Sequence, residues 1–193
     1  MRLFIAVNFD NEIKSRLLRI QNRIREQSVR GKFSRPENLH LTLIFFGETA
    51  QDRLPLICSA IETVCSACAC FSLDFTRVGF FKHSNKELWW IGSNASAGLQ
   101  ELIKLQLLLA ENLRARGIKF DERPFSPHIT LGREIKSTGP VDLPGKARPQ
   151  SGEGSPVQTI SVPVNRISLM KSQHIKGLLV YTEIGYSAIH PVP

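Results

Sequence analysis

A short motif that occurs twice concentrates the reactive side chains of this sequence. The segments HLTL (40–43) and HITL (128–131) share one pattern, and their histidines stand 88 residues apart in a chain of 193. Histidine gains or loses a proton near neutral pH, so one copy can act as a general base while the other acts as a general acid. A threonine hydroxyl can donate a hydrogen bond to a phosphate oxygen. Two facing copies would therefore hold a phosphodiester from both sides and move protons without a metal.

Each copy lies in an apolar segment that predicts a β-strand. Side chains alternate along a strand, so His40 and Thr42 point to one face and the two leucines of that copy point to the other. His128 and Thr130 follow the same rule. The aliphatic residues can anchor both strands in a core, which leaves the four polar side chains to line a cleft. The spacing alone leaves open which histidine is the acid.

A single copy of the motif has an ordinary structural explanation, since a histidine near a β-branched residue occurs by chance in many strands. The chain contains five histidines, and two of them share this context half a chain apart. The repetition favours a functional pair. By contrast, His174 and His190 stand in turn-like or terminal segments and are expected at the surface.

Four further side chains are candidates for contact with a substrate. Arg133 follows the second motif and can neutralise phosphate charge through paired hydrogen bonds, although a solvated arginine at a strand end would look the same. Phe9, Phe46 and Phe125 can offer rings for base stacking, because single-stranded RNA is commonly read in this way. Most of the 11 phenylalanines are nevertheless expected in the core.

Two other features can face the same cleft. Trp89 and Trp90 are neighbours in a predicted strand and point to opposite faces, so at most one of them lines the cleft. Arg30, Lys32 and Arg35 form a basic cluster just before the first motif. Such a cluster is usually a solvated loop, and here it can also guide an RNA backbone.

No metal or cofactor is expected. Cys58, Cys65, Cys68 and Cys70 include the run CSACAC, but no second cysteine or histidine pair follows at zinc spacing. Buried or helix-end thiols explain these cysteines better. The sequence also contains no P-loop, dinucleotide-binding fingerprint or adenylation lysine motif, so an ATP-driven ligase has no support.

Length and charge agree with a domain that meets a polyanion. The chain has 193 residues and a mass of 21.7 kDa, which suits one domain or two small lobes. Its net charge of +8 favours a partner such as RNA. No run of roughly 18 apolar residues is present, so no membrane span is expected, and the apolar run at residues 3–7 is too short for a signal peptide. We expect a cytoplasmic monomer.

The remaining segments alternate between predicted helices and strands. Apolar residues at helical spacing predict helices at 11–28, 53–68 and 97–116, the first ended by Gly31. Strands are expected at residues 3–9, 39–46, 71–81, 87–91, 124–131, 159–170 and 177–184. Four prolines and four glycines between residues 138 and 156 predict a flexible surface loop. Helices interleaved with hairpin-like strand pairs favour the α+β class.

The sequence around the two motifs resembles the two-histidine phosphoesterase superfamily. The motifs stand as ENLHLTLIFFGE (37–48) and RPFSPHITLGRE (123–134). The closer resemblance is to the RNA 2′,3′-cyclic phosphodiesterases, historically called bacterial and archaeal 2′-5′ RNA ligases. The segments MRLFIAV (1–7), LWWIG (88–92) and ISLMKSQHIKGLLVYTEI (167–184) also look like the family pattern, although they are less specific than the motifs.

This resemblance implies a fold and a set of roles. It implies a single pseudo-twofold domain over residues 1–193, with two α+β lobes that each contain an antiparallel sheet with helices outside it. One motif comes from each lobe, and the active-site cleft lies between the lobes. The implied reaction is hydrolysis of an RNA 2′,3′-cyclic phosphate to a 2′-phosphate. His40 is then the proton donor and His128 the proton acceptor, while Thr42 and Thr130 hold the phosphate oxygens.

Three alternatives remain open at this point. The substrate can be a small cyclic nucleotide or an ADP-ribose cyclic phosphate instead of RNA. The reverse transesterification can join tRNA halves through a 2′-5′ linkage. A non-catalytic RNA-binding module is the third alternative, but binding alone needs cations and not two titrating imidazoles.

Overall fold

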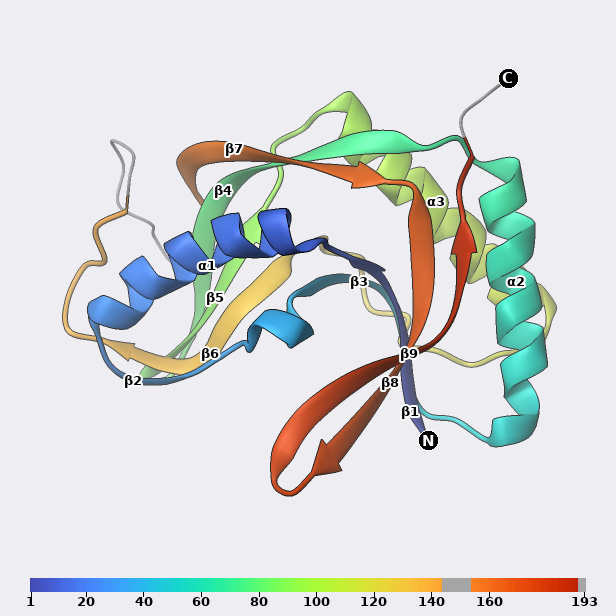
Figure 1. The fold of residues 1–193 in the computed structure, drawn as a ribbon, viewed down its shortest axis with the longest axis horizontal. Helices are drawn as coiled ribbons and strands as arrows, with labels where there is room; N and C mark the ends of the chain where they lie inside the picture. The colour runs from blue at the N-terminus through green and yellow to red at the C-terminus, as the bar shows by residue number, and fades with distance from the viewer. Residues whose placement is uncertain (144–153, 191–193) are drawn as a thin grey trace.

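The computed structural model describes residues 1–143 and 154–190 (Figure 1). These residues form nine strands and three α-helices, so the predicted α+β class is confirmed. The elements are β1 (Arg2–Asn8), α1 (Asn11–Glu26), β2 (Ser28–Phe33), β3 (His40–Glu48), α2 (Leu54–Ala67), β4 (Phe71–His83), β5 (Lys86–Gly92), α3 (Ala97–Ala115), β6 (Ile129–Ser137), β7 (Ser155–Val164), β8 (Arg166–Ile175) and β9 (Leu178–Ala188). Short 3-10 turns, η1 (Pro36–Asn38) and η2 (Gln51–Arg53), precede β3 and α2.

All nine strands belong to one antiparallel sheet. Their order is β7-β4-β5-β6-β3-β1-β8-β9, and β2 pairs with β6 outside this path. The two motif strands, β3 and β6, meet at the centre through the pair Leu41 and Ile129. The resemblance implied a separate sheet in each lobe. The structure differs because backbone pairing between the motif strands joins the two halves into one sheet.

Two strand–helix–strand units flank this junction. The units are β1–α1–β3, in which β2 and η1 follow the helix before β3 begins, and β5–α3–β6; in each of them the two named strands pair antiparallel. Outward from the junction, β1, β8 and β9 follow β3, while β5, β4 and β7 follow β6. The second strand of each unit begins at a motif, so the repeated motif marks a repeated local topology.

The helices tie the two halves together (Figure 1). Although α1 follows β1, it packs against β2, β6 and β7 of the opposite half. Helix α2 packs against β8 and β9, and α3 packs against α2, β3 and β4. Each half therefore depends on a helix that contacts the other half, which fixes the two motif strands relative to each other.

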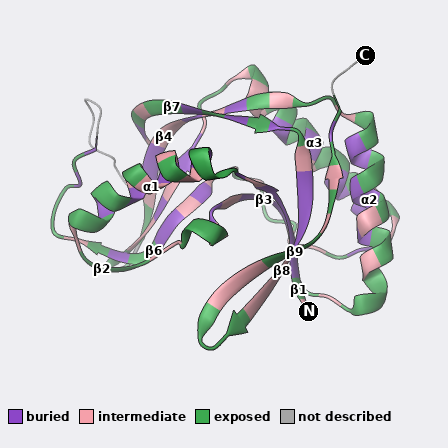
Figure 2. Ribbon diagram, viewed as in Figure 1, coloured by how far each residue is buried: buried purple, intermediate pink, exposed green. Residues whose placement is uncertain are grey.

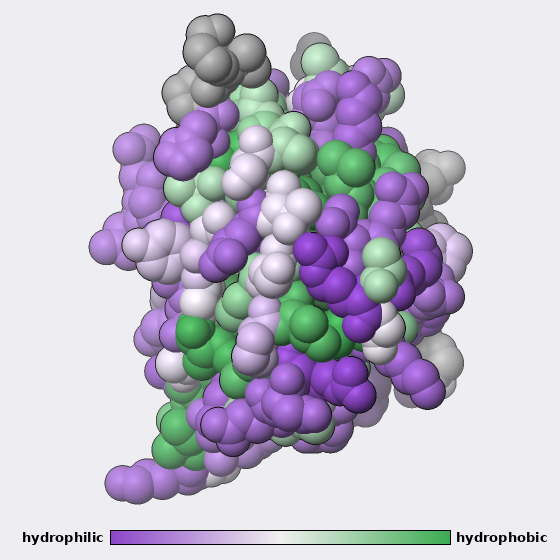
Figure 3. All heavy atoms as spheres, turned by 90° about the vertical axis from the view of Figure 1, so that its right-hand side faces the viewer, coloured by the Kyte–Doolittle hydropathy of each residue, from purple (hydrophilic) through white to green (hydrophobic). Residues whose placement is uncertain are grey.

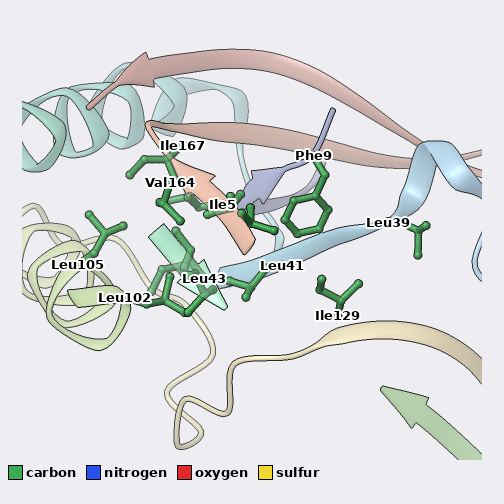
Figure 4. Close-up of a cluster of buried hydrophobic side chains, with 14 of the residues drawn as sticks. Ile5, Phe9, Leu39, Leu41, Leu43, Leu102, Leu105, Ile129, Val164 and Ile167 are labelled. Atoms are coloured by element: carbon green, nitrogen blue, oxygen red, sulfur yellow. The ribbon is translucent and has the colours of Figure 1, made fainter. Parts of the chain in front are cut away.

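The two faces of the sheet are different. Leu3 and Ile5 of β1 point into the main core, which the apolar sides of all three helices cover (Figures 2 and 4). Between them, Phe4 and Ala6 point to the opposite face and form a small cluster with Met170 of β8. The motif side chain Thr42 lies on this second face too, because it pairs with Ala6.

Strand β2 was not predicted. The first helix ends at Glu26, and Ser28–Phe33 continues as a strand that pairs with β6. Its apolar signal is weak, since Val29 is 66% exposed. Gly31, expected to end the helix, instead allows close approach of β2 to β6, because a Cβ there would lie 2.6 Å from Cγ1 of Ile135.

Ordered structure extends into the predicted loop at residues 138–156 from both ends. Residues 144–153 lie outside the described residues. Before them, Val141 and Leu143 are buried, and Gln27 holds this segment by donating to the backbone oxygen of Asp142 and accepting from its backbone nitrogen. After them, Ser155 already begins β7. The Pro and Gly content of the segment concealed these contacts.

The outer surface shows no extended apolar band on the side of α2 and α3. Figure 3 views the molecule from the right-hand side of Figure 1 and shows apolar residues scattered among hydrophilic ones. The exposed apolar side chains of these helices are Leu56, Ile103, Leu107 and Leu108. Within the part of the chain that the structure describes, no helix has the length and apolarity to span a membrane.

The contact between α3 and β4 gives a test of this packing. A Cβ at Gly98, in the first turn of α3, would overlap the backbone oxygen of Ser72. We predict that Gly98→Ala lowers the free energy of unfolding by about 1–3 kcal/mol through overpacking, measured by urea denaturation. Gly139→Ala is the matched control, because no heavy atom of the described residues lies within 4 Å of its Cβ. Equal stability of the two variants would contradict the close helix–sheet contact.

Candidate active site

The pairing of β3 with β6 brings the two motifs together. Leu41 lies opposite Ile129 in an antiparallel register. That register places His40 opposite Thr130 and Thr42 opposite His128, with Cβ atoms of opposite residues about 4.5–5.5 Å apart. The histidines then lie on one diagonal of a four-residue group and the threonines on the other, so both imidazoles and both hydroxyls can reach one bound group.

Burial separates the two faces of the motif strands. The aliphatic residues of both motifs are 0–3% exposed and belong to the main core (Figure 4). The polar residues are half-buried on the opposite face; they are His40, Thr42, His128 and Thr130. Burial of the aliphatic side chains stabilises the position of both strands. The polar side chains on the opposite face are therefore held in place.

Backbone carbonyls fix the tautomer of both histidines. Nδ1 of His40 lies 2.7 Å from the backbone oxygen of Asn38, and Nδ1 of His128 lies 2.7 Å from that of Ser126. A carbonyl oxygen only accepts, so each Nδ1 carries the proton and donates it. Nε2 of each ring is consequently the atom available for proton transfer. Sequence reasoning missed these carbonyls, because a backbone oxygen has no signature in residue type.

Hydroxyl and guanidinium groups complete the site. Nε2 of His40 lies 3.0 Å from Oγ1 of Thr42, which donates to the neutral ring. On the other strand, Nη2 of Arg133 donates to Oγ1 of Thr130 at 3.4 Å. The structure thus brings Arg133 beside the predicted phosphate-binding group, where its charge acts on both histidines.

His40 lies in an aromatic environment. Its ring centroid is 4.8 Å from that of Phe4 and 5.1 Å from that of Tyr181, which meets it edge-on. Phe4 and Tyr181 also contact each other at 4.9 Å. Tyr181 of β9 is distant in sequence from either motif, and no local pattern marks it as a neighbour of the site.

Burial lowers the pKa of both motif histidines. The pKa of His40 falls from 6.5 to about 4, chiefly through desolvation; the hydrogen bond to Asn38 raises this pKa, and Arg133 and His128 lower it by smaller amounts. The pKa of His128 is lowered by desolvation and by Arg133, against the bond to Ser126. Both imidazoles are therefore neutral at neutral pH, and a bound anion would raise both pKa values.

Phe9 was predicted to stack a base, and this prediction is wrong. The side chain is 7% exposed and packs edge-on against Phe75 at 6.2 Å. Figure 4 shows its ring pointing into the main core. Phe9 lies at the end of β1, where one more step of alternation continues the core face.

Phe46 also faces the core and not the motif side chains. Strict alternation from Thr42 would place Phe46 on the same face as Thr42. A bulge in the pairing of β1 with β3 buries both Leu43 and Ile44, and this shifts the alternation so that Phe46 turns to the core face. Phe45 packs against the second-face cluster instead. Phe125 is half-buried against the main core, and its role in base stacking stays a prediction.

The two tryptophans diverge as predicted. Trp89 is 1% exposed in the core, where its Nε1 donates to Glu87 at 2.8 Å. Trp90 pairs with Thr130 across β5 and β6, so its side chain lies on the face of the motif histidines. Phe81 of β4 lies 5.6 Å from the Trp90 ring.

A surface hollow elsewhere collects basic residues. It has a volume of about 320 Å³ and is lined by Arg30, Gly31, Lys32, Lys86 and Glu134. Both lysines are paired with Glu134, at 2.7 Å and 3.2 Å. None of these residues belongs to HLTL (40–43) or HITL (128–131), so we assign the chemistry to the histidine group and not to this hollow.

The described residues supply acid–base groups and not a cluster of metal ligands. Among them, no group of three or more His, Cys, Asp or Glu side chains could hold a metal ion. Cys65 is buried on α2, Cys58 and Cys68 are half-buried, and Cys70 is exposed. The arrangement on β3 and β6 can bind an anion, donate a proton and accept one.

The chain is similar to known phosphoesterases over most of its length. The family model described as LigT like Phosphoesterase matches residues 7–90 and 94–181, and each matched segment contains one motif. A Methanothermobacter thermautotrophicus protein named RNA 2′,3′-cyclic phosphodiesterase is 28% identical, covering 95% of this chain and 96% of that protein. An Archaeoglobus fulgidus protein of the same name is 33% identical, covering 72% of this chain and 76% of that protein.

Solved structures agree with this match. Escherichia coli LigT in apo form has a TM-score of 0.75 and 25% identity, covering 98% of this chain and 97% of that chain. The same protein complexed with phosphate has a TM-score of 0.72, 25% identity and the same coverage. This chain belongs to the LigT-like phosphoesterase family of two-histidine phosphoesterases.

Proposed function

We propose that the protein hydrolyses 2′,3′-cyclic phosphate ends of RNA and leaves 2′-phosphates. The observation that carries the proposal is the pair of imidazoles with a protonated Nδ1 bound to a backbone carbonyl and an unprotonated Nε2, on one face of two paired strands. The activity in the names of the relatives and the phosphate complex of E. coli LigT support it. The net charge of +8 favours RNA over a small cyclic nucleotide.

The reaction needs one proton accepted and one donated. Nε2 of His128 takes a proton from water, and the water oxygen forms a bond to phosphorus. The bond from phosphorus to the ribose O3′ breaks, and Nε2 of His40 gives its proton to O3′. Hydroxyls of Thr42 and Thr130 donate to the non-bridging oxygens, and Arg133 offsets their negative charge. One water is consumed, and the phosphate stays on the 2′ oxygen.

Burial explains why His40 suits the role of donor. Both rings are neutral in the free protein because desolvation lowers each pKa. The cyclic phosphate brings a negative charge, which favours a protonated ring nearby. His40 has the more strongly lowered pKa of the two rings, and charges attract more strongly where solvent is excluded. Substrate binding therefore raises the pKa of His40 and supplies the donor.

Replacement of either histidine tests the proposal. On an oligoribonucleotide ending in a 2′,3′-cyclic phosphate, we predict that His40→Ala and His128→Ala each lower kcat/KM by about 10²–10⁴, since each removes one proton transfer. The double variant should lose less than the product of the single losses. The product is compared chromatographically with 2′- and 3′-phosphate standards, with and without a chelator.

His190→Ala is the matched control, because His190 is exposed beyond the end of β9 and its backbone pairs with Ala69 and Cys70, outside the motif strands. It should keep full activity, and circular dichroism should show that every variant is folded. Folded His40→Ala and His128→Ala proteins that both keep nearly full turnover would mean that the repeated motif is structural.

The lowered pKa values also predict the pH dependence of the rate. In the free protein, kcat/KM requires neutral His128 and protonated His40. The pKa of His40 is about 4 and that of His128 lies below 6.5. We therefore expect a maximum of kcat/KM below pH 6.5, followed by a fall of about tenfold per pH unit on the alkaline side.

Bound substrate raises both pKa values, so the falling limb of kcat should lie at higher pH than that of kcat/KM. Initial rates across the acidic and neutral range check this, with circular dichroism at each pH as the control for folding. A value of kcat/KM that stays constant through neutral pH would exclude the assigned proton states.

A further inference from the structure

The antiparallel pairings align four side chains in one row across the motif face. Trp90 of β5 lies opposite Thr130 of β6, and Asn8 of β1 lies opposite His40 of β3. The pairing of the motif strands places His40 opposite Thr130. The row therefore runs Trp90, Thr130, His40, Asn8, with an indole next to a proposed phosphate ligand.

The neighbouring row has no large side chain next to its motif residues. The same registers place Gly92 beside His128, and Ala6 lies opposite Thr42. Ala6 is fully buried in the small second-face cluster. An aromatic ring beside a motif threonine is thus found on the β5 side, and the same indole leans over Gly92 toward the row of His128.

Trp90 and Phe81 form a joint aromatic surface on this side. Their neighbours Trp89 and Phe80 pack together at 5.0 Å on the core face, so Trp90 and Phe81 share the motif face. The two rings lie 5.6 Å apart with planes inclined by 30°. Phe81 is 44% exposed, so its ring is open to a ligand.

The Trp90 indole lies against the sheet. A Cβ on Gly92 would be 3.2 Å from ring atom Cζ3, and a Cβ on Gly154 would be 3.0 Å from Cη2. The ring nitrogen Nε1 is buried and has no hydrogen-bond partner among the described residues. Burial of an unpaired N–H group costs free energy, and a phenyl ring has no such group. Packing alone therefore does not explain a tryptophan here. The larger π surface of the indole is what a stacked base would use.

We propose that Trp90 is the platform on which the base of the terminal nucleotide stacks, and that Phe81 extends this platform toward the preceding base. The inference rests on the proposed function. In a nucleoside 2′,3′-cyclic phosphate, base and phosphate are attached to one ribose, so a base lies within one ribose of a phosphate held by Thr130. The same row contains His40, the proposed donor to the ribose O3′. The nucleoside then lies along this row, and the attacking water lies on the side of His128.

Tryptophan fluorescence tests the platform without turnover. The chain has two tryptophans, and Trp89 is shielded in the core. Titration with adenosine 2′-monophosphate should quench the emission of the wild-type protein. Trp90→Phe should abolish the quench, and Trp89→Phe should retain it. Inorganic phosphate should leave emission unchanged, because it has no base. A quench that persists in Trp90→Phe would overturn the proposal.

Kinetics on the cyclic-phosphate oligoribonucleotide give a second readout. Trp90→Leu should raise KM roughly 5- to 100-fold, the loss expected for one stacked base. The value of kcat should change little, because stacking stabilises the bound substrate and the transition state equally. Phe81→Ala should raise KM less, and its exposure makes the fold tolerant of it. Leu107→Ala, 52% exposed on α3, is the matched control and should leave KM unchanged.

The outcomes separate the two proposals. If the wild-type protein hydrolyses the RNA and Trp90→Leu leaves KM unchanged, the platform is wrong and the proposed function stands. If the wild-type protein does not hydrolyse the RNA, the proposed function fails, and the nucleotide titration still decides the platform. Quenching through Trp90 then supports it, and absence of quenching overturns it.

Discussion

The backbone pairing of Leu41 with Ile129 determines where every reactive group lies. This antiparallel pair joins the two halves of the sheet, and both side chains are fully buried. A slip of either strand by one residue would exchange the faces, placing imidazoles in the core and aliphatic side chains outside. The aliphatic residues of the motifs are therefore as necessary for the site as His40 and His128. Burial of one face fixes the chemistry on the other.

The same arrangement sets the proton affinity of the site. Each imidazole is held by a carbonyl two residues before it, and partial burial among side chains such as Phe4 and Tyr181 makes the charged form of His40 costly. A neutral pair with a nearby Arg133 is ready for an anion, because the anion supplies the counter-charge that the free protein lacks. Binding of the phosphate therefore also favours protonation of the proposed donor, His40.

Local patterns in the sequence predicted the motif strands, the three helices and the meeting of two histidines with two threonines. They failed where long-range pairing decides the outcome. The single sheet depends on a contact between segments 88 residues apart, which periodicity cannot show. The bulge beside Leu43 reversed the face of Phe46, and the exposed strand Ser28–Phe33 has too few apolar residues to be recognised. The opposite faces of the tryptophans were predictable from alternation, but the position of Trp90 beside Thr130 needed the register.

Nitrogen NMR of the imidazole rings tests the central claim most directly. In the free protein at neutral pH, the account predicts a protonated Nδ1 and an unprotonated Nε2 for both His40 and His128. Adenosine 2′-monophosphate should then protonate Nε2 of His40, while the exposed His190 keeps its spectrum. Rings that are already charged in the free protein, or an Nε2 of His40 that stays unprotonated when the nucleotide is bound, would contradict the account.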